Sequence, residues 1–294
     1  MNAGMRVTTI RRFPIAPLSG RPVRPRSHLC GREVNGVEKG LGTSCANAAD
    51  AAAEPRSTLV LIPGTLCDQR VFGRQIPALR AIARVRVADL SSMKCREQWL
   101  NALIDGLPER FSVAGFSLGG MFALELLRRV PERIERVALI ASNAQPGTSA
   151  LQKKSRRLGH LWRAGGARAV IAALEPSYFH RARVRYEQGA LLRAMAERAG
   201  WKSARAQFAW AAERPAGYGA LAVFGGPTLI LSGAHDSICT RRQQRLMAAA
   251  SRQSHWIELS RCGHFLTLEE PAKIGRALAR WMREPVVSEQ GVLN

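Results

Sequence analysis

The chain has 294 residues, 46% of them hydrophobic, with 44 Lys and Arg against 22 Asp and Glu, giving a formal net charge of +22. This composition can fill the core of one large or two smaller domains, and no apolar run of about 18 residues predicts a membrane span. So basic a chain could suit nucleic acid, but no nucleic-acid-binding motif accompanies the charge and aromatic residues make up only 6%, so we expect no nucleic-acid partner.

Residues 1–56 are rich in Pro, Gly, Arg and Ser and lack hydrophobic periodicity, which predicts a disordered basic leader. Seven arginines precede the first acidic residue, Glu33. That composition resembles a transit peptide, although a translation start placed too far upstream would have the same appearance, and both interpretations stay open.

Residues 57–146 alternate strand and helix patterns, which predicts the first part of a parallel sheet with helices on both faces. The first strand covers 58–62, is entirely apolar after Thr58, and ends in the loop PGTLCD at 63–68. A loop at the carboxyl end of a parallel strand lies where open α/β sheets place their sites.

The pentapeptide GFSLG at 115–119 lies between a strand pattern at 111–114 and a helix pattern at 118–130. This is the arrangement of a nucleophile elbow, in which a serine occupies a sharp strand-to-helix turn and its hydroxyl projects above the sheet. The glycines are needed because the strand and helix backbones pass so close together. We therefore predict Ser117 as a nucleophile.

Residues 147–220 interrupt the alternation with helical patterns, which predicts a helical cap inserted into the sheet domain. Residues 221–294 return to strands and helices and form the second part of the core. A buried strand at 227–233 leads into Asp236, and another at 254–259 leads into His264. The order Ser, Asp, His along the chain matches that of a hydrolytic triad on a parallel sheet.

Four segments, LVLIPGTLCD, VAGFSLGG, LSGAHD and CGHFLTLEEP, make residues 58 to about 283 resemble the α/β-hydrolase superfamily of serine esterases. Small bacterial carboxylesterases, including the type that cleaves a methyl ester from a carrier-protein-bound acyl chain, are the most similar members. The resemblance implies an α/β fold with a doubly wound, mostly parallel sheet and an inserted helical cap.

The same resemblance implies an oxyanion hole made of the Leu118 amide and an amide of the loop at 63–68, called the early loop below. Thr65 is the candidate for the second amide. Many relatives have His-Gly where this chain has Pro63-Gly64, so the other amides of the loop stay open as alternatives. Dehalogenases and epoxide hydrolases have an aspartate at the position of Ser117, and the serine therefore indicates acyl transfer.

We interpret the chain as a serine hydrolase that cleaves a carboxylic ester or thioester. Ser117 would form the acyl-enzyme, His264 would act as base, and Asp236 would orient the imidazole. A cofactor-free acyltransferase or perhydrolase on the same residues is one alternative, and a non-catalytic binding protein of this fold is another. No cofactor is expected.

The cap carries an excess of charge, with 14 basic and four acidic residues between 147 and 220. A basic lid would attract an anionic or carrier-linked substrate, whereas a solvated surface without function is the alternative. The hypothesis names a group of basic residues as lining the approach to Ser117: Lys153, Lys154, Arg156, Arg157, Arg181, Arg183 and Arg185.

The six cysteines form no C-x-x-C pair and have no spacing typical of zinc ligands. We therefore expect no metal site, and nothing in the sequence requires disulfide bonds. A reducing, cytoplasmic location fits that pattern. The sequence carries no indication of the oligomeric state.

Overall fold

A single seven-stranded sheet forms the centre of the protein, whose computed structural model describes residues 5–10 and 57–286. The strand order is β1-β7-β6-β5-β4-β2-β3, and every neighbouring pair is parallel except β1 with β7. The strands are β1 (Met5–Ile10), β2 (Thr58–Ile62), β3 (Arg84–Val87), β4 (Phe111–Phe116), β5 (Ile134–Ile140), β6 (Thr228–Gly233) and β7 (Ser254–Leu259).

The central strands are predominantly apolar because helices cover both faces of the sheet. In β2, for example, Leu59 and Leu61 pack into one hydrophobic cluster, whereas Val60 and Ile62 pack into the cluster on the opposite face. All four side chains are fully buried. The two clusters hold the sheet rigidly, so the loops at its carboxyl ends start from fixed positions.

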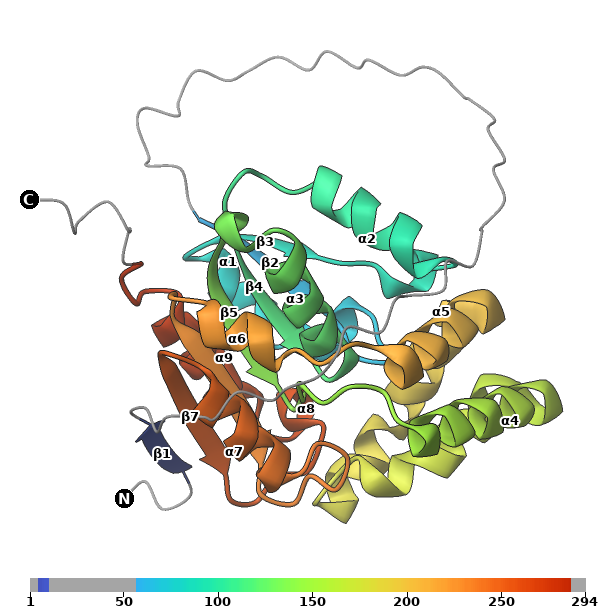
Figure 1. Cartoon of the computed structure of the whole chain (residues 1–294). Helices are drawn as coiled ribbons and strands as arrows, with labels where there is room; N and C mark the ends of the chain where they lie inside the picture. The colour runs from blue at the N-terminus through green and yellow to red at the C-terminus, as the bar shows by residue number, and fades with distance from the viewer. Residues whose placement is uncertain (1–4, 11–56, 287–294) are drawn as a thin grey trace, which may run out of the picture.

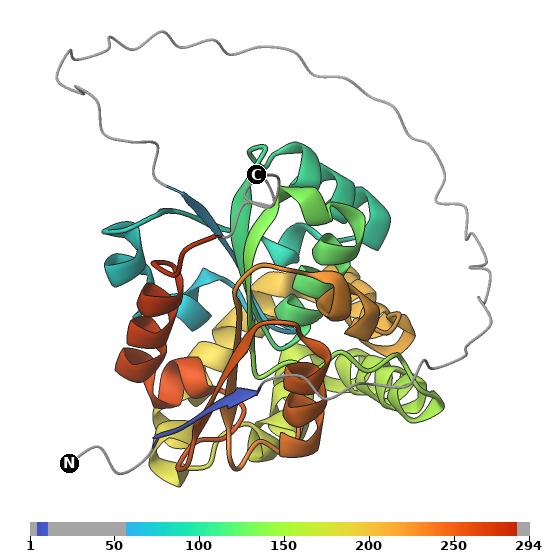
Figure 2. The same ribbon diagram turned by 60° about the vertical axis from the view of Figure 1, so that its left-hand side comes forward.

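Two layers of helices flank the sheet, as Figure 2 shows with the sheet seen nearly edge-on. Helices α1 (Ile76–Arg80), α8 (Leu266–Glu269) and α9 (Pro271–Trp281) cover one face, and α2 (Arg96–Asp105), α3 (Leu118–Arg129), α6 (Tyr218–Val223) and α7 (Arg241–Ala250) cover the other. Short 3₁₀ turns are η1 (Gln69–Phe72), η2 (Leu90–Ser92), η3 (Pro131–Arg133) and η4 (Glu175–Ser177). The sequence prediction of a doubly wound, mostly parallel α/β sheet is confirmed.

Between β5 and β6 the chain leaves the sheet and forms two long helices, α4 (Ser149–Leu174) and α5 (Ala182–Glu213), which pack against each other. They project beyond the carboxyl ends of the strands and form the inserted cap (Figure 1). Each contains a break at glycine: Gly166 has φ +63° and Gly200 has φ +68°. These left-handed backbones suit glycine, and they let each helix change direction over the site.

The strand β1 differs from the expectation that residues 1–56 have no regular structure. Met5–Ile10 pairs antiparallel with β7 at the edge of the sheet, so the prediction of disorder is wrong for these six residues. Six residues without a regular alternation of apolar and polar side chains are too few to distinguish a strand from a loop by pattern alone. The rest of the predicted leader, residues 1–4 and 11–56, lies outside the described residues.

None of the helices in the described ranges has the length and apolar character that crossing a membrane demands.

Candidate active site

Ser117 occupies the turn between β4 and α3, in a backbone conformation that is rare for a residue with a side chain. Its φ is +53° and its ψ is −113°. A conformation of this kind costs about 1–3 kcal/mol and persists only where the surroundings enforce it. The surroundings here are a hydrogen bond from the Ser117 amide to Ile140 O (2.8 Å) and one from the Ser142 hydroxyl to Ser117 O (2.8 Å).

The glycines around Ser117 are required by close backbone approach. A Cβ at Gly115 would lie 2.2 Å from the carbonyl oxygen of Gly119, and a Cβ at Gly119 would lie 2.0 Å from that of Ile62. Neither neighbour is a side chain that could move aside. The GFSLG pattern therefore reflects the packing of β2, β4 and α3 at this point, which lifts the Ser117 hydroxyl into the cavity above the sheet.

Asp236 and His264 meet Ser117 in a continuous chain of hydrogen bonds. His264 Nδ1 donates to Asp236 Oδ2 at 2.8 Å, and the Ser117 hydroxyl lies 2.9 Å from His264 Nε2. Because the carboxylate only accepts, the imidazole proton is assigned to Nδ1, which leaves Nε2 as an acceptor for the Ser117 proton. All three residues are buried, so water competes little for these bonds.

Asp236 is fixed by the turn that follows β6. Its Oδ1 accepts from the amides of Ile238 (2.8 Å) and Cys239 (2.9 Å), which leaves Oδ2 for His264. The residue before it in the chain, His235, points elsewhere and stacks on His180, with 3.8 Å between the ring centroids. Of this pair, Asp236 is the residue that bonds to His264.

The loop that carries His264 is held by the cap as well as by the core. Tyr178 O accepts from the amides of His264 (2.9 Å) and Phe265 (3.0 Å). The buried Glu269 carboxylate accepts from Gly263 N (2.6 Å) on that loop, and also from the amides of His180 (3.1 Å) and Arg181 (3.2 Å) just before α5. Glu269 thus links the core loop that carries His264 to the cap segment that precedes α5.

The early loop predicted to supply an oxyanion donor passes next to the nucleophile. A Cβ at Gly64 would lie 3.3 Å from Ser117 Cβ, and Thr65 and Leu118 both line the same cavity as Ser117. Across residues 5–10 and 57–286, neither the Thr65 amide nor the Leu118 amide donates a hydrogen bond. Two free amides therefore border the hydroxyl.

The neighbouring amide of the early loop is occupied. Leu66 N donates to Gln207 Oε1 of α5 at 2.7 Å, and Leu66 has a left-handed φ of +58°. Gln207 is fully buried and its amide nitrogen donates to Ser203 Oγ (2.8 Å) and Leu90 O (3.3 Å), which fixes its orientation. The cap helix thereby holds the loop with Leu66 N turned away and Thr65 N left free.

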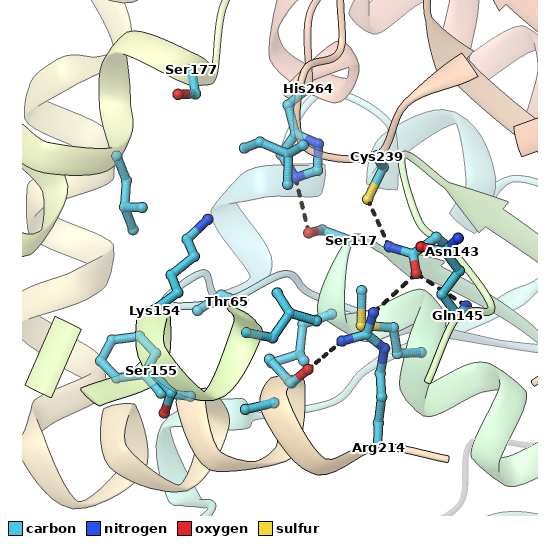
Figure 3. A pocket seen from close by; sticks show the side chains of 18 of the residues that line it. Thr65, Ser117, Asn143, Gln145, Lys154, Ser155, Ser177, Arg214, Cys239 and His264 are labelled. Carbon is cyan, nitrogen blue, oxygen red and sulfur yellow. Dashed lines mark hydrogen bonds between the residues drawn. The ribbon is translucent and has the colours of Figure 1, made fainter. Parts of the chain in front are cut away.

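A cavity of about 490 Å³ opens above Ser117 and His264, between the sheet and the cap (Figure 3). Its walls are mostly apolar, and they come from both regions: Met121, Leu151, Leu158, Leu174, Phe208 and Ile238. A space of this size and character suits a small organic molecule or one part of a larger one.

Of the basic cap residues proposed to line the approach, only Lys154 lines this cavity. Arg181 instead bonds to Glu269 O and pairs with Glu270 (3.1 Å), and Arg183 pairs with Glu187 (2.8 Å). The sequence reasoning did not identify Arg214, which lines the cavity and is 5% exposed. Arg214 directly follows α5 and precedes Pro215, and neither neighbour in the sequence indicates that its side chain faces the cavity.

Asp236, Cys239 and His264 also bring three ligand atoms within 4.8 Å of one another. Burial, and after it the charge of Asp236, raises the pKa of the Cys239 thiol to about 12, so the thiol stays protonated at neutral pH. Both imidazole nitrogens of His264 are already engaged. The donor set thus fits a hydrogen-bonded relay better than a metal centre, which needs thiolate and a free imidazole nitrogen.

Comparison with known proteins gives one family match: the profile described as "Alpha/beta hydrolase family" matches residues 59–277. Among curated proteins, the chain is 36% identical over 95 residues to "Pimeloyl-[acyl-carrier protein] methyl ester esterase" of Aromatoleum aromaticum. It is 33% identical over 92 residues to the protein of that name from Nitrosomonas europaea. These matches cover 30% and 29% of this chain, and 38% and 36% of the relatives.

Solved structures resemble nearly the whole of the described chain. A thermophilic esterase from Thermogutta terrifontis has a TM-score of 0.67 at 22% identity, with 77% of this chain and 89% of that one covered. An enol-lactonase from Burkholderia xenovorans LB400 has a TM-score of 0.67 at 23% identity, with 78% and 92% covered. At such low identity these likenesses establish the fold alone.

Proposed function

Since the chain belongs to the alpha/beta hydrolase family, we propose that it hydrolyses carboxylic esters or thioesters through an acyl-enzyme on Ser117. The observation that carries this proposal is the buried chain of hydrogen bonds from Asp236 through His264 to the Ser117 hydroxyl, at 2.8 and 2.9 Å. An orienting acid, a base and a nucleophile within hydrogen-bond reach are the arrangement that activates a serine.

In the first half of the reaction, His264 Nε2 accepts the hydroxyl proton while Ser117 Oγ attacks the carbonyl carbon. The tetrahedral oxyanion lies against the Thr65 and Leu118 amides, each worth roughly 10²–10³ in rate because the charge develops only in the transition state. His264 then gives the proton to the departing alcohol or thiol. Asp236 stabilises the imidazolium that exists between the two transfers.

In the second half, water enters the position of the leaving group. His264 accepts a proton from the water as its oxygen attacks the acyl-enzyme, and it returns the proton to Ser117 Oγ when the acid departs. The products are the free carboxylic acid and the regenerated serine. Every proton in this cycle moves through His264, so the mechanism draws on no cofactor.

A finer candidate is a methyl ester of an acyl chain carried on a protein. The similarity to the pimeloyl-[acyl-carrier protein] methyl ester esterases supports it. So does the net charge of residues 147–220, since an acidic carrier would be attracted to exposed basic residues such as Arg156 and Arg157. A carrier-linked methyl ester and the same ester without carrier would be compared as substrates.

The decisive experiment is labelling with a fluorophosphonate, which reacts with activated serines, followed by peptide mass spectrometry. We expect one adduct, on Ser117, and none in Ser117→Ala, together with turnover of p-nitrophenyl esters by the unaltered protein. No labelling and no turnover would favour a binding protein of this fold. Alcohols or peroxide that outcompete water for the acyl-enzyme would favour an acyltransferase or perhydrolase.

A further inference from the structure

The cavity above Ser117 carries positive charge without a matching acid. Lys154 and Arg214 both line it, and no Asp or Glu of the described residues does. The two cations come from different helical segments of the cap, the start of α4 and the end of α5. Arg214 is buried, and a buried charge is costly unless a counter-charge is near, whereas Lys154 reaches the cavity from an exposed position at its rim.

Lys154 has the geometry of a ligand-binding residue. Figure 3 shows its side chain leaving α4 and extending into the cavity, toward the part that holds Ser117 and His264. It forms no ion pair or hydrogen bond with any part of the chain that the structure describes. Burial and Asp236 raise the pKa of the Cys239 thiol, and the charge of Lys154 opposes that rise. Lys154 is therefore close enough to Cys239, in the wall of the cavity beside Asp236, to interact with it electrostatically.

Arg214 adds a second charge that the protein does not neutralise. Its guanidinium bonds to Ala211 O and to Asn143 Oδ1 (3.0 Å), which are neutral acceptors, and its Nε has no partner in the described residues. Asn143 is in turn held by its contacts to Cys239 Sγ (3.4 Å) and Gln145 N (3.2 Å), so the group is rigid. A buried guanidinium keeps its charge, which makes this wall of the cavity positive.

We infer that the acyl group of the substrate carries its own carboxylate, which Lys154 binds in the field of Arg214 while the ester carbonyl lies at Ser117. The apolar walls between these charged groups suit a methylene chain. The substrate class is therefore the half ester or thioester of a straight-chain dicarboxylic acid. This inference rests on the proposed ester hydrolysis at Ser117 and is an alternative to the carrier-linked methyl ester, because an acyl chain whose far end is bonded to a carrier has no free carboxylate there.

The test compares monomethyl esters of dicarboxylic acids of increasing length with methyl esters of the simple fatty acids of equal length. We expect kcat/KM of the unaltered protein to favour the anionic ester about tenfold at the best length, which corresponds to 1.4 kcal/mol. The matching dimethyl esters, which have the same shape without the charge, should behave like the neutral series.

Lys154→Met should bring the ratio of anionic to neutral kcat/KM down to about one, and Lys154→Arg, which keeps the charge, should restore most of it. Lys153→Met is the matched control, because both lysines are exposed on α4 but only Lys154 lines the cavity. Its ratio should equal that of the unaltered protein. Equal effects of the two methionine variants, or no preference for the anionic ester at any length, would overturn the inference.

The proposed function and this inference fail in distinguishable ways. If the protein turns over neutral esters and Ser117→Ala abolishes that turnover, the proposed function stands, and an absent carboxylate preference refutes the inference alone. If neither the neutral nor the anionic esters are cleaved and Ser117 takes no fluorophosphonate, both are refuted.

Discussion

The core and the cap contribute to the candidate site in different ways. The core supplies the groups proposed to react, because Ser117, Asp236 and His264 each follow a strand of one rigid sheet. The cap supplies the cations of the cavity and the contacts that hold two loops of the core, through Gln207, Tyr178 and the segment before α5. The proposed chemistry therefore depends on residues of the sheet domain, whereas the proposed selectivity depends on cap residues that line the cavity.

This division means that substitutions in the two regions should differ in kind. Changes in the core residues should remove turnover of every ester, whereas changes in the cap should alter the preference among esters or the alignment of a loop. The contacts between the regions should lie between these extremes. Four sets of variants test that order.

The largest effect is expected in the core. Ser117→Ala and His264→Ala should each lower kcat on the order of 10⁶-fold, and the double variant should cost little more, because nucleophile and base act as a unit. Asp236→Asn should cost less, roughly 10⁴-fold, since it disturbs only the tautomer and charge of the imidazole. Steady-state kinetics on a p-nitrophenyl ester measure these losses. If the losses of the two single variants added up in the double variant, Ser117 and His264 would not act as a unit.

The next effect is expected where the regions meet. Glu269→Gln keeps the size of the side chain but weakens the bonds from Gly263 N and the two cap amides, each worth about 1.5–3 kcal/mol when the acceptor is charged. Displacing the His264 loop by a fraction of an ångström should lower kcat on the order of 10²-fold.

The readouts for Glu269→Gln are kcat, KM and the melting temperature, with kcat measured well below the transition. Glu270→Gln is the matched control, since the Glu270 carboxylate pairs with Arg181 and Lys273 nearer the surface and, among the described residues, forms no hydrogen bond with the His264 loop. A loss of thermal stability with unchanged kcat in Glu269→Gln would mean that the carboxylate holds the fold but does not position His264.

The contrast between core and cap also describes what the sequence could predict. The elbow around Ser117 is encoded by neighbours in the chain, because the glycines that allow it lie within two residues. The mostly parallel sheet with an inserted helical cap follows from the strand and helix patterns along the chain, and that prediction is confirmed. The elbow and the strand and helix patterns can be predicted without knowing which residues far apart in the sequence are in contact.

The contacts of the cap were not predicted because each joins residues far apart in sequence. Gln207 meets Leu66 across 141 positions, and nothing near either residue indicates the other. A signal existed in the polar pair Ser203 and Gln207, one turn apart on an otherwise apolar helix face, which marks a buried polar contact. Glu269 lies within the quoted segment CGHFLTLEEP but was given no role.

A smaller effect is expected for the contact that holds the early loop. Gln207→Leu removes the acceptor of the Leu66 amide and leaves that amide buried without a partner, which should let the loop relax from its left-handed conformation. The Thr65 amide would then be misaligned with the oxyanion, and we expect kcat to fall about tenfold with little change in KM, since the loss falls on the transition state.

Ser203→Ala is the control for Gln207, because it removes the bonds of Ser203 Oγ with Leu90 O and Gln207 Nε2 but keeps Gln207 Oε1 as the acceptor of the Leu66 amide, with Gln207 Nε2 still bonded to Leu90 O. It should lower thermal stability without a comparable fall in kcat. If both variants lower kcat equally, the packing of α5 matters and the contact with Leu66 does not.

The smallest effect is expected for the charged surface of the cap. Arg156 and Arg157 are exposed and do not line the cavity, so they can act on an anionic ester only through the solvent. Such long-range attraction is screened as the Debye length falls from about 30 Å at 0.01 M salt to about 8 Å at 0.15 M. Replacing both by glutamine should lower kcat/KM for an anionic ester about twofold at low salt and leave it unchanged at 0.15 M.

Lys154→Met should instead retain its effect at the higher salt, because a contact inside the cavity is screened less. Kinetics of the two variants across this salt range separate long-range attraction by the surface arginines from direct contact with Lys154. An equal salt dependence of the two variants would mean that Lys154 also acts only through long-range attraction.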